Sequence, residues 1–364
     1  MFQISALKKI VKSYIFKLYV ASFRIKENYF LRSVNFFPAS GKPKVFLGFQ
    51  KKNSGGGLKL RDLEIYGSDG NSYNIVYLLS SSLPYNFKEI IVKAKKAGSK
   101  IIWNQNGIGF PAWAGAKHHE INKAFKTGIE AADIVVFQSD FARTSVHEMV
   151  ANTDNLKKKV IYNAINTQLF KPRISKETQK LEILIAGSHN DVNRVIMAIL
   201  VVSSLWKSGI DCVLKIAGKI GVLGLKKVQD TIVECNMLDR VVFLGSYGRE
   251  EAPGFFANAD ILLHLQPFDN CPTVVIEAMA SGLMVVGPNN GGVPELLGEE
   301  LSFQLVPNLT TFNRYDWGNP EQYAEKIISL IPLLDSLKIK ARERAVNCFD
   351  LQKWIQYHQE LFYF

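Results

Sequence analysis

The sequence predicts two α/β domains, each built on a parallel β-sheet with helices on both faces. Short apolar segments of strand length alternate with amphipathic segments of helix length, and this alternation occurs twice, from residue 44 to 172 and again from residue 181. The chain has 364 residues, 47% of them hydrophobic, which is long for one core and sufficient for two. We therefore expect two Rossmann-like sheets whose strands end at a shared cleft.

Charge and cysteine content restrict the kind of partner and compartment. Residues 1–172 carry 26 Lys and Arg against 11 Asp and Glu, whereas residues 173–364 carry 18 against 22. The basic half therefore predicts an anionic partner. Nucleic acid is one such partner, but no recognition motif supports it, so we expect none to bind. The four cysteines lack the spacing of a metal site and fit a reducing cytoplasm.

Residues 1–33 form a basic segment that is rich in aromatic side chains. It has no acidic residue before Glu27, and its apolar residues between Leu7 and Leu18 share one helical face. Such a helix is typical of a protein bound to an anionic membrane surface. A helix packed on its own domain or a disordered leader fits the same residues. No run of about 18 uncharged apolar residues occurs, so we expect a cytoplasmic protein, peripheral at the inner face of the cytoplasmic membrane, rather than a spanning helix.

The first domain is predicted over residues 34–172. We expect a flexible turn over 53–57, which contains Gly56 and Gly57, and the other elements follow in order. Strands are expected at 44–49, 74–79, 100–103 and 133–138, and helices at 58–65, 84–97 and from 139. The loop 104–113 follows a strand and contains amides, glycines and two aromatic residues, which suits a sugar. His118 begins the next helix and is a candidate base, although a histidine there is commonly a surface residue.

The second domain is predicted over residues 173–350. Strands are expected at 181–186, 213–216, 241–244 and 260–265, with a helix at 192–207 after the first strand. The stretch 267–295 follows the fourth of these strands. In it, Pro272 suits the first turn of a helix and Gly282 suits its left-handed end. The free N–H groups at that helix start predict a phosphate site near Asn270, Cys271 and Thr273. The pair Gly291-Gly292 is expected to let backbone approach a ligand.

These residues resemble the donor site of GT-B glycosyltransferases, in particular the retaining family 4 group. Glu277 matches the second of two glutamates in the family motif, and residues 291–295 match its Gly-Gly-x-x-Glu run. Asp269 stands where the family has the first glutamate, and Ser188 stands where it has an arginine after Gly187. The segment 160–172 is similar to the family's crossing segment, and residues 351–364 to its last helix, which packs back on the first domain.

The resemblance implies a role for each of these residues. Asp269, Glu277, His118 and Arg194 would act at the reacting centre, with Arg194 and the lower-ranked Lys219 binding the diphosphate. Gly187 and Ser188, the 270–273 turn and the glycine pair Gly56-Gly57 would also contact the donor. The base would lie at Gly245, Ser246 and Tyr247.

The resulting hypothesis is a retaining, metal-independent glycosyltransferase for cell-surface polysaccharide. It would move a sugar from a UDP- or GDP-sugar to a glycan or lipid-linked acceptor, without a cofactor. No Asp-x-Asp pair occurs in the chain, which agrees with a leaving diphosphate stabilised by cations and a helix dipole. A degenerate protein of the same fold, which binds glycan or nucleotide without turnover, is the alternative that Ser188 and Asp269 favour.

Overall fold

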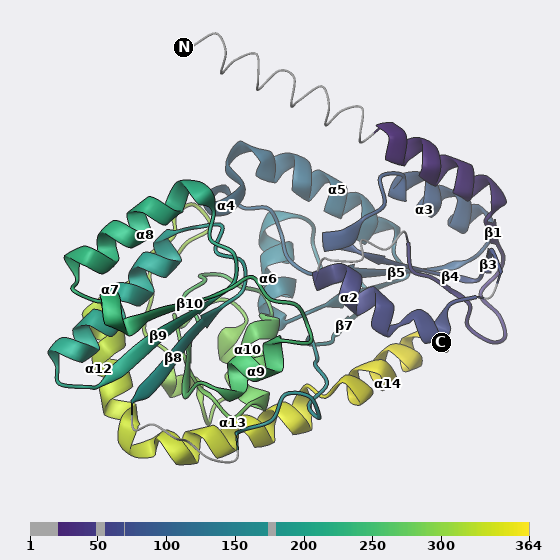
Figure 1. The fold of residues 1–364 in the computed structure, drawn as a ribbon. Coiled ribbons are helices and arrows are strands. Elements are labelled where there is room, and N and C mark those ends of the chain that lie inside the picture. Colours follow the sequence, from purple (N-terminus) through teal and green to yellow (C-terminus); the bar gives the residue numbers. More distant parts are fainter. Residues whose placement is uncertain (1–20, 49–54, 69, 174–179, 364) are drawn as a thin grey trace, which may run out of the picture.

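The computed structural model describes residues 21–48, 55–68, 70–173 and 180–363. It contains two five-stranded parallel sheets in separate lobes, which confirms the predicted fold class (Figure 1). No helix among the described residues combines the length and the hydropathy needed to cross a membrane.

The first sheet has the strand order β2-β4-β5-β6-β7, so each strand after β2 is added at the same edge. Its strands are β2 (Val45–Phe46), β4 (Ile75–Leu79), β5 (Lys100–Gln105), β6 (Ile134–Phe137) and β7 (Lys158–Val160). A separate parallel pair is formed by β1 (Asn35–Phe36) and β3 (Ser72–Tyr73). Alternate residues of the main strands enter two different cores, as expected for a sheet that is covered on both faces.

Helices cover both faces of the first sheet. One core contains side chains of α3 (Phe87–Lys96), α5 (His118–Ala131) and α6 (Asp140–Met149). The other contains side chains of α2 (Gly55–Asp62) and α14 (Leu351–Phe362). The short α4 (Pro111–Ala114) and the 3₁₀ turns at residues 64–66, 80–82 and 115–117 complete the lobe.

The glycine run of the first domain is helical, which corrects the predicted turn. Helix α2 begins at Gly55, three residues before the expected start at Leu58, and ends at Asp62. Gly56 and Gly57 therefore lie in its first turn. Residues 53 and 54 of the predicted turn lie outside the described residues.

The second sheet has the order β10-β9-β8-β11-β12, so the chain reverses direction across the sheet between β8 and β11. Its strands are β8 (Leu181–Ala186), β9 (Cys212–Ala217), β10 (Val241–Gly245), β11 (Ile261–Leu263) and β12 (Met284–Val286). In such sheets a ligand binds beyond the carboxyl ends of the two strands at the reversal. Here those ends lead to Gly187 and to the 264–273 segment.

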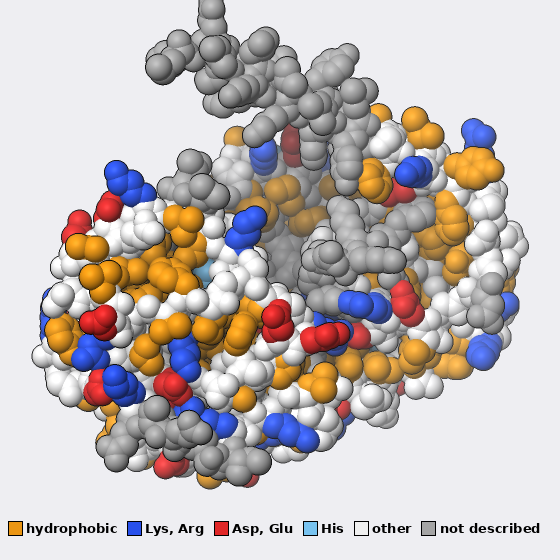
Figure 2. All heavy atoms as spheres, in the orientation of Figure 1, with side chains coloured by type: hydrophobic (Ala, Val, Ile, Leu, Met, Phe, Trp, Pro, Cys, Tyr) orange, Lys and Arg blue, Asp and Glu red, His pale blue; other side chains and the backbone are white. Residues whose placement is uncertain are grey.

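The helices of the second lobe pack around one large core. They are α7 (Asn193–Lys207), α8 (Val222–Glu234), α9 (Ala252–Ala257), α10 (Thr273–Ala280), α11 (Val293–Leu297), α12 (Pro320–Leu330) and α13 (Leu334–Cys348). Short 3₁₀ turns lie at residues 238–240, 302–304 and 331–333. As predicted, Gly282 follows α10 in the left-handed region, with φ of 70°. On the outer surface of this lobe, cationic and anionic side chains are interspersed (Figure 2).

An ion-pair network connects the second sheet to Arg173, which precedes its first strand, and to Lys338 of α13, which follows its last strand. Arg173 donates to Glu182 at 2.6 Å and to Asp260 at 2.7 Å. Lys215 also reaches Glu182, at 2.8 Å, and Lys338 reaches Asp260, at 3.2 Å. The Asp260 side chain is 2% exposed, so removing one partner would leave charge in a buried place.

The chain crosses between the lobes twice, and the two crossings are bonded to each other. Ile165 N–H donates to Phe349 O at 3.1 Å, and Leu351 N–H donates to Ile165 O at 2.9 Å. Helix α14 then packs on the first lobe, where the buried His358 Nε2 lies 2.9 Å from Tyr77 Oη. The last helix therefore belongs to the core of the first lobe, although it is last in sequence.

Residues 21–33 are helical and rest against α3. Glu27 accepts a hydrogen bond from Asn86 N–H at 3.1 Å, and Leu31 joins the first core. Phe23, Ile25 and Tyr29 remain exposed. The end of the basic segment is thus packed on its own domain, while residues 1–20, which carry most of the predicted amphipathic pattern, lie outside the described residues.

Candidate functional site

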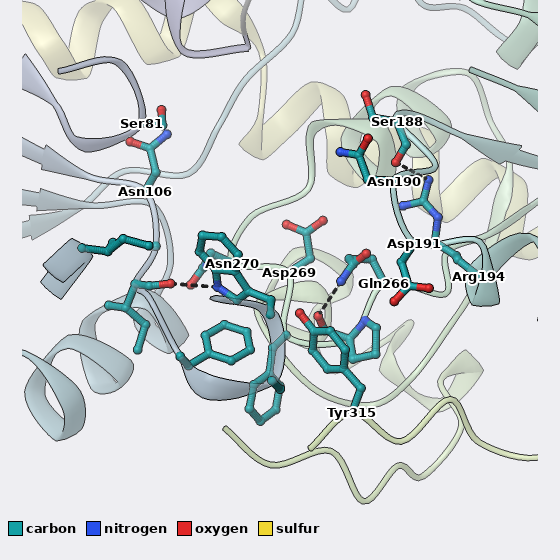
Figure 3. Close-up of a pocket in the computed structure, with 18 of the residues that line it drawn as sticks. Ser81, Asn106, Ser188, Asn190, Asp191, Arg194, Gln266, Asp269, Asn270 and Tyr315 are labelled. Atoms are coloured by element: carbon teal, nitrogen blue, oxygen red, sulfur yellow. Dashed lines mark hydrogen bonds between the residues drawn. The ribbon is translucent and has the colours of Figure 1, made fainter. Parts of the chain in front are cut away.

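A recess separates the two lobes on the surface, and two adjoining cavities of about 820 and 480 Å³ lie between them (Figure 2). Both cavities are lined by Asn106 of the first lobe and by Ser188, Arg194, Asp269 and Asn270 of the second. The close-up shows Ser81 and Asn106 on one side and the second-lobe residues on the other (Figure 3). The cavities lie beyond the ends of β8 and β11, the place that the strand order predicts.

The turn that carries Asp269 is held in a strained conformation. Phe268 has a φ of 52°, which is unusual for a bulky residue, and its N–H donates to Asn290 Oδ1 at 2.9 Å. A Cβ on Gly291 would lie 2.6 Å from Asp269 O, and one on Gly292 would lie 1.9 Å from Asn270 O. The two glycines therefore admit the backbone of this turn.

Asp269 is a carboxylate in a poorly solvated place. Burial raises its pKa to about 6, and nearby Arg194 offsets part of that effect. Its Oδ2 lies 3.6 Å from His264 Nε2, and Figure 3 shows the carboxylate directed into the cavity. Burial lowers the pKa of His264 to about 3, so its ring is neutral near pH 7. Asp269 is thus charged at neutral pH and is available to a positive centre in the cavity.

A hydrogen bond to His189 fixes the orientation of the Arg194 guanidinium. Its Nη2 donates to His189 Nδ1 at 2.7 Å and to Ser188 O at 3.2 Å, and the residue is only 8% exposed. Burial, followed by the charge of Arg194, lowers the pKa of His189 to about 4. Since His189 Nε2 lies 3.0 Å from Ala217 O, a neutral ring protonated at Nε2 satisfies both contacts. The guanidinium is therefore oriented before any ligand arrives.

The amino end of α10 opens into the smaller cavity. Pro272 and Thr273 line it together with Gly187, which has a φ of 105°. Two buried polar atoms on these walls, His264 Nε2 and Asn270 Oδ1, have no hydrogen-bond partner among the described residues. Free helix N–H groups, a cation and unsatisfied polar atoms together provide the chemistry of an anion site that also orients polar groups of a ligand.

Cys271 ties this turn to the crossing segment. Asn163 donates from Nδ2 to Cys271 O at 2.5 Å and from its backbone N–H to Cys271 Sγ at 3.2 Å. Burial raises the pKa of the Cys271 thiol to about 12, so it is not a thiolate nucleophile. Its contribution is to position the turn.

Glu277 lies one turn further along α10, beside the loop that follows β10. Burial raises its pKa to about 7, and the positive charge of Arg249 opposes this shift. Glu277 in turn adds to the effect of burial in raising the pKa of Tyr247 to about 12. The structure thus brings Glu277 and Tyr247 together. Gly245, the last residue of β10, and Ser246 after it are exposed.

The first-lobe wall of the larger cavity combines aromatic and polar side chains. Trp113 is 53% exposed, and its Nε1 donates to Ile108 O at 3.1 Å. Phe110 supports it at a ring distance of 6.1 Å and also contacts Tyr315 of the second lobe at 6.0 Å. Asn106 and Ser81 supply polar groups to the same wall. Such a surface stacks on sugar rings and bonds to hydroxyls.

Several predicted site residues lie elsewhere. Lys219 is exposed at the end of β9 and is not among the residues lining the two cavities. His118 does not line them either, because its Nδ1 bonds to Gly115 O at 2.7 Å and its ring stacks on His119. Gly57 lies in the first turn of α2 together with Gly56 and is likewise not among the residues lining these walls.

Three residues of the site were missed by sequence reasoning: Lys59, His189 and His264. Lys59 lines the smaller cavity, and it follows the predicted glycine run by only two residues. His189 and His264 adjoin segments that were singled out, yet a lone histidine in an apolar or glycine-rich context gives no signal of its own.

Glu295 of the second lobe connects the two lobes through hydrogen bonds to the first. Its carboxylate accepts hydrogen bonds from the backbone N–H groups of Asp140 and Phe141, both at 2.7 Å, and from Tyr162 Oη at 3.1 Å. These N–H groups belong to the first turn of α6, where a carboxylate also interacts favourably with the helix dipole. Glu295 therefore sets the distance between the lobes rather than contacting a ligand.

Two parallel-sheet domains with a cleft at the ends of their strands define the GT-B fold of glycosyltransferases, which agrees with the resemblance inferred from the motifs. Residues 166–344, which span the donor side of the chain, match the family model described as "Glycosyl transferases group 1".

The relatives are distant and are matched over part of their length. The chain is 24% identical over 259 residues to N-acetyl-alpha-D-glucosaminyl L-malate synthase of Bacillus anthracis, covering 67% of this chain and 62% of that protein. It is 27% identical over 226 residues to the gpi3 subunit of phosphatidylinositol N-acetylglucosaminyltransferase of Schizosaccharomyces pombe, covering 61% of this chain and 48% of that protein. The chain thus spans less than two thirds of these relatives.

Solved structures share the fold. HepE of Anabaena in complex with UDP-glucose superposes with a TM-score of 0.62 and 17% identity, over 90% of this chain and 98% of HepE. Sucrose-phosphate synthase of Thermosynechococcus elongatus gives a TM-score of 0.67 and 15% identity, over 86% of this chain and 79% of that one.

Proposed function

We propose that this protein transfers a sugar from a nucleotide-diphosphate sugar to an acceptor hydroxyl with retention of anomeric configuration. The observation that carries the proposal is the convergence of three features on one cavity between the lobes. These are the buried guanidinium of Arg194, the amino end of α10 and the carboxylate of Asp269. A leaving diphosphate requires the first two, and a sugar that develops positive charge requires the third.

In this mechanism the diphosphate binds between Arg194 and the N–H groups at Thr273, and the ribose hydroxyls bind Glu277. As the bond from the anomeric carbon to the diphosphate oxygen breaks, the acceptor oxygen forms its bond on the same face, and its proton passes to the leaving diphosphate. Asp269 stabilises the positive charge that appears at the anomeric carbon. Because that charge is largest in the transition state, this contact accelerates turnover more than it strengthens binding.

The acceptor binds on the first-lobe wall. Trp113 offers an aromatic face for stacking, and Asn106 and Ser81 offer hydrogen bonds to hydroxyls. This combination suits a saccharide, either a glycan or the sugar head of a lipid-linked acceptor, in cell-surface polysaccharide synthesis. Trp113→Ala should raise the KM for the acceptor while leaving nucleotide affinity unchanged.

Ligand-induced stabilisation tests the donor. The parent chain is heated with UDP, GDP, ADP or CMP, and a nucleotide at about a hundred times its Kd adds about 2.7 kcal/mol of apparent stability. UDP or GDP should raise the melting temperature, and transfer should then be assayed with the matching nucleotide sugar. Stabilisation without transfer or donor hydrolysis would favour a binding protein of the same fold. No stabilisation by any of the four would contradict the proposal.

Contact with an anionic membrane surface is also proposed, supported by the basic segment 1–33 and by the exposed Phe23, Ile25 and Tyr29 at its end. Deleting residues 2–20 removes cations that each contribute about 1 kcal/mol near such a surface. The deletion should reduce sedimentation with phosphatidylglycerol vesicles and leave nucleotide affinity intact. Equal sedimentation would contradict a membrane role for that segment.

A further inference from the structure

Lys59 is a cation that the first lobe contributes to the donor cavity. It lies in the second turn of α2 and lines the same cavity as Gly187, Arg194 and Thr273 of the second lobe. It therefore faces the proposed diphosphate position from the side opposite the helix terminus of α10.

A second contact fixes α2 against the donor domain. Asp62, three residues after Lys59, lies 3.4 Å from Arg249 in the loop after β10. Residues 59 and 62 are close together on a helix, so this ion pair keeps the Lys59 face of α2 directed at the donor domain. The placement of Lys59 thus depends on contacts between the lobes and not on the glycine run alone.

The charge state of the Lys59 ammonium group favours the binding of an anion beside it. Burial lowers its pKa to about 8, while Cys271 and Asp269 partly oppose the shift. The ammonium is therefore mostly charged at neutral pH but incompletely compensated. A diphosphate next to it would stabilise the charged form and gain the corresponding binding free energy.

We propose that Lys59 binds the diphosphate of the donor from the first lobe, opposite Arg194, so that the donor bridges the two lobes. This inference rests on the proposed function and supplies the second cation for the diphosphate. Ser188, which stands where the family has an arginine, carries no charge, and Lys219 lies outside the cavities. A donor site that both lobes contribute to is complete only when the lobes approach each other.

The test compares nucleotides with nucleosides. Titration calorimetry on the full chain measures UDP against uridine and GDP against guanosine for the parent, Lys59→Met, Lys59→Arg and the control Arg61→Met. Arg61 is exposed on the same helix. Lys59→Met should weaken whichever diphosphate binds by roughly tenfold or more and leave the nucleoside unchanged, because one charge-assisted contact is lost. Lys59→Arg should retain most of the affinity, and Arg61→Met should match the parent.

The pH dependence of diphosphate affinity gives a second readout. It is measured first on the parent protein, so it does not require the Lys59→Met variant to fold. The groups facing Lys59 are Asp269, Cys271, Arg194 and His358, and Glu277 also lies near the donor. Asp269 and Glu277 have pKa values of about 6 and 7, His358 of about 4, and Cys271 of about 12. Among these described groups, Lys59 is therefore the one that titrates between pH 8 and 9.5. Parent affinity for the diphosphate should fall over this range, and that of Lys59→Arg should stay level.

The outcomes separate the two proposals. If the parent binds neither UDP nor GDP, the proposed function itself fails. If the parent binds one of them and Lys59→Met binds it equally well, with a level pH profile for the parent, then the role of Lys59 is refuted while the function stands. Equal loss of nucleotide and nucleoside affinity in Lys59→Met would also refute it, because the effect would then be structural.

Discussion

Replacing Asp269 by asparagine should slow transfer and, at the same time, stabilise the protein. The side chain keeps its shape but loses the charge that we place beside the anomeric carbon. We expect the rate at saturating donor to fall by about tenfold or more, which corresponds to about 1.4 kcal/mol, with little change in nucleotide affinity. Asp269→Glu, which restores the family's residue, should keep partial activity.

The effect on stability follows from the raised pKa. Moving the pKa of Asp269 from 3.8 to about 6 corresponds to about 3 kcal/mol in favour of the neutral form. The side chain retains 32% exposure, so solvent screening reduces this figure, and we expect about 1–2 kcal/mol. Because the folded pKa lies above the unfolded value, the parent loses this stability as pH rises from about 4 to above 6. The asparagine variant does not lose it.

Urea unfolding of both proteins at pH 4 and pH 8, with initial rates at pH 8, measures the two effects. The variant should match the parent at pH 4 and exceed it at pH 8. A stability difference that is the same at both pH values would show that burial of charge is not its cause. Transfer by the variant at the parent's rate would make Asp269 a turn residue with no catalytic role.

Three further predictions follow from other parts of the structure. Glu277→Ala should weaken donor binding by about 1.5–3 kcal/mol, and Glu277→Gln by less, because a carboxylate makes charge-assisted bonds to ribose hydroxyls; calorimetry checks this, and unchanged affinity in a folded alanine variant would remove Glu277 from the site. Transfer should survive EDTA, since Arg194, Lys59 and the end of α10 neutralise the diphosphate; loss of activity that Mn²⁺ or Mg²⁺ restores would contradict this. Gly128→Ala should cost about 1–3 kcal/mol in urea unfolding, because its Cβ would lie 2.1 Å from the Trp103 ring. The control Gly254→Ala, with open space at its Cβ, should cost nothing, and equal effects of the two would refute the packing argument.

The alternation of strands and helices, and the segments that carry the cavity, were determined by the sequence itself. Each strand is a short apolar run whose period is local, and the carboxyl ends of parallel strands necessarily meet at one edge. The helix that begins after Pro272 and stops before Gly282 was likewise predictable, since both residues act within one turn of their own position. Arg194 could be selected as a cation of the site because the resemblance to the family implies cations shortly after the first strand of this domain.

The tertiary structure alone decided which distant groups complete the cavity. Lys59 reaches it only because α2 packs across from the donor turn, and Glu295 joins α6 through hydrogen bonds to residues more than 150 positions away. His189 shows its role only once Ala217 O and Arg194 stand on either side of its ring. Gly291 and Gly292 admit the backbone of residues 269 and 270, which approaches them from another loop. These contacts depend on how two lobes and several loops meet in space. The hydrophobic periodicity of one segment carries no information about which residues of a distant segment pack against it.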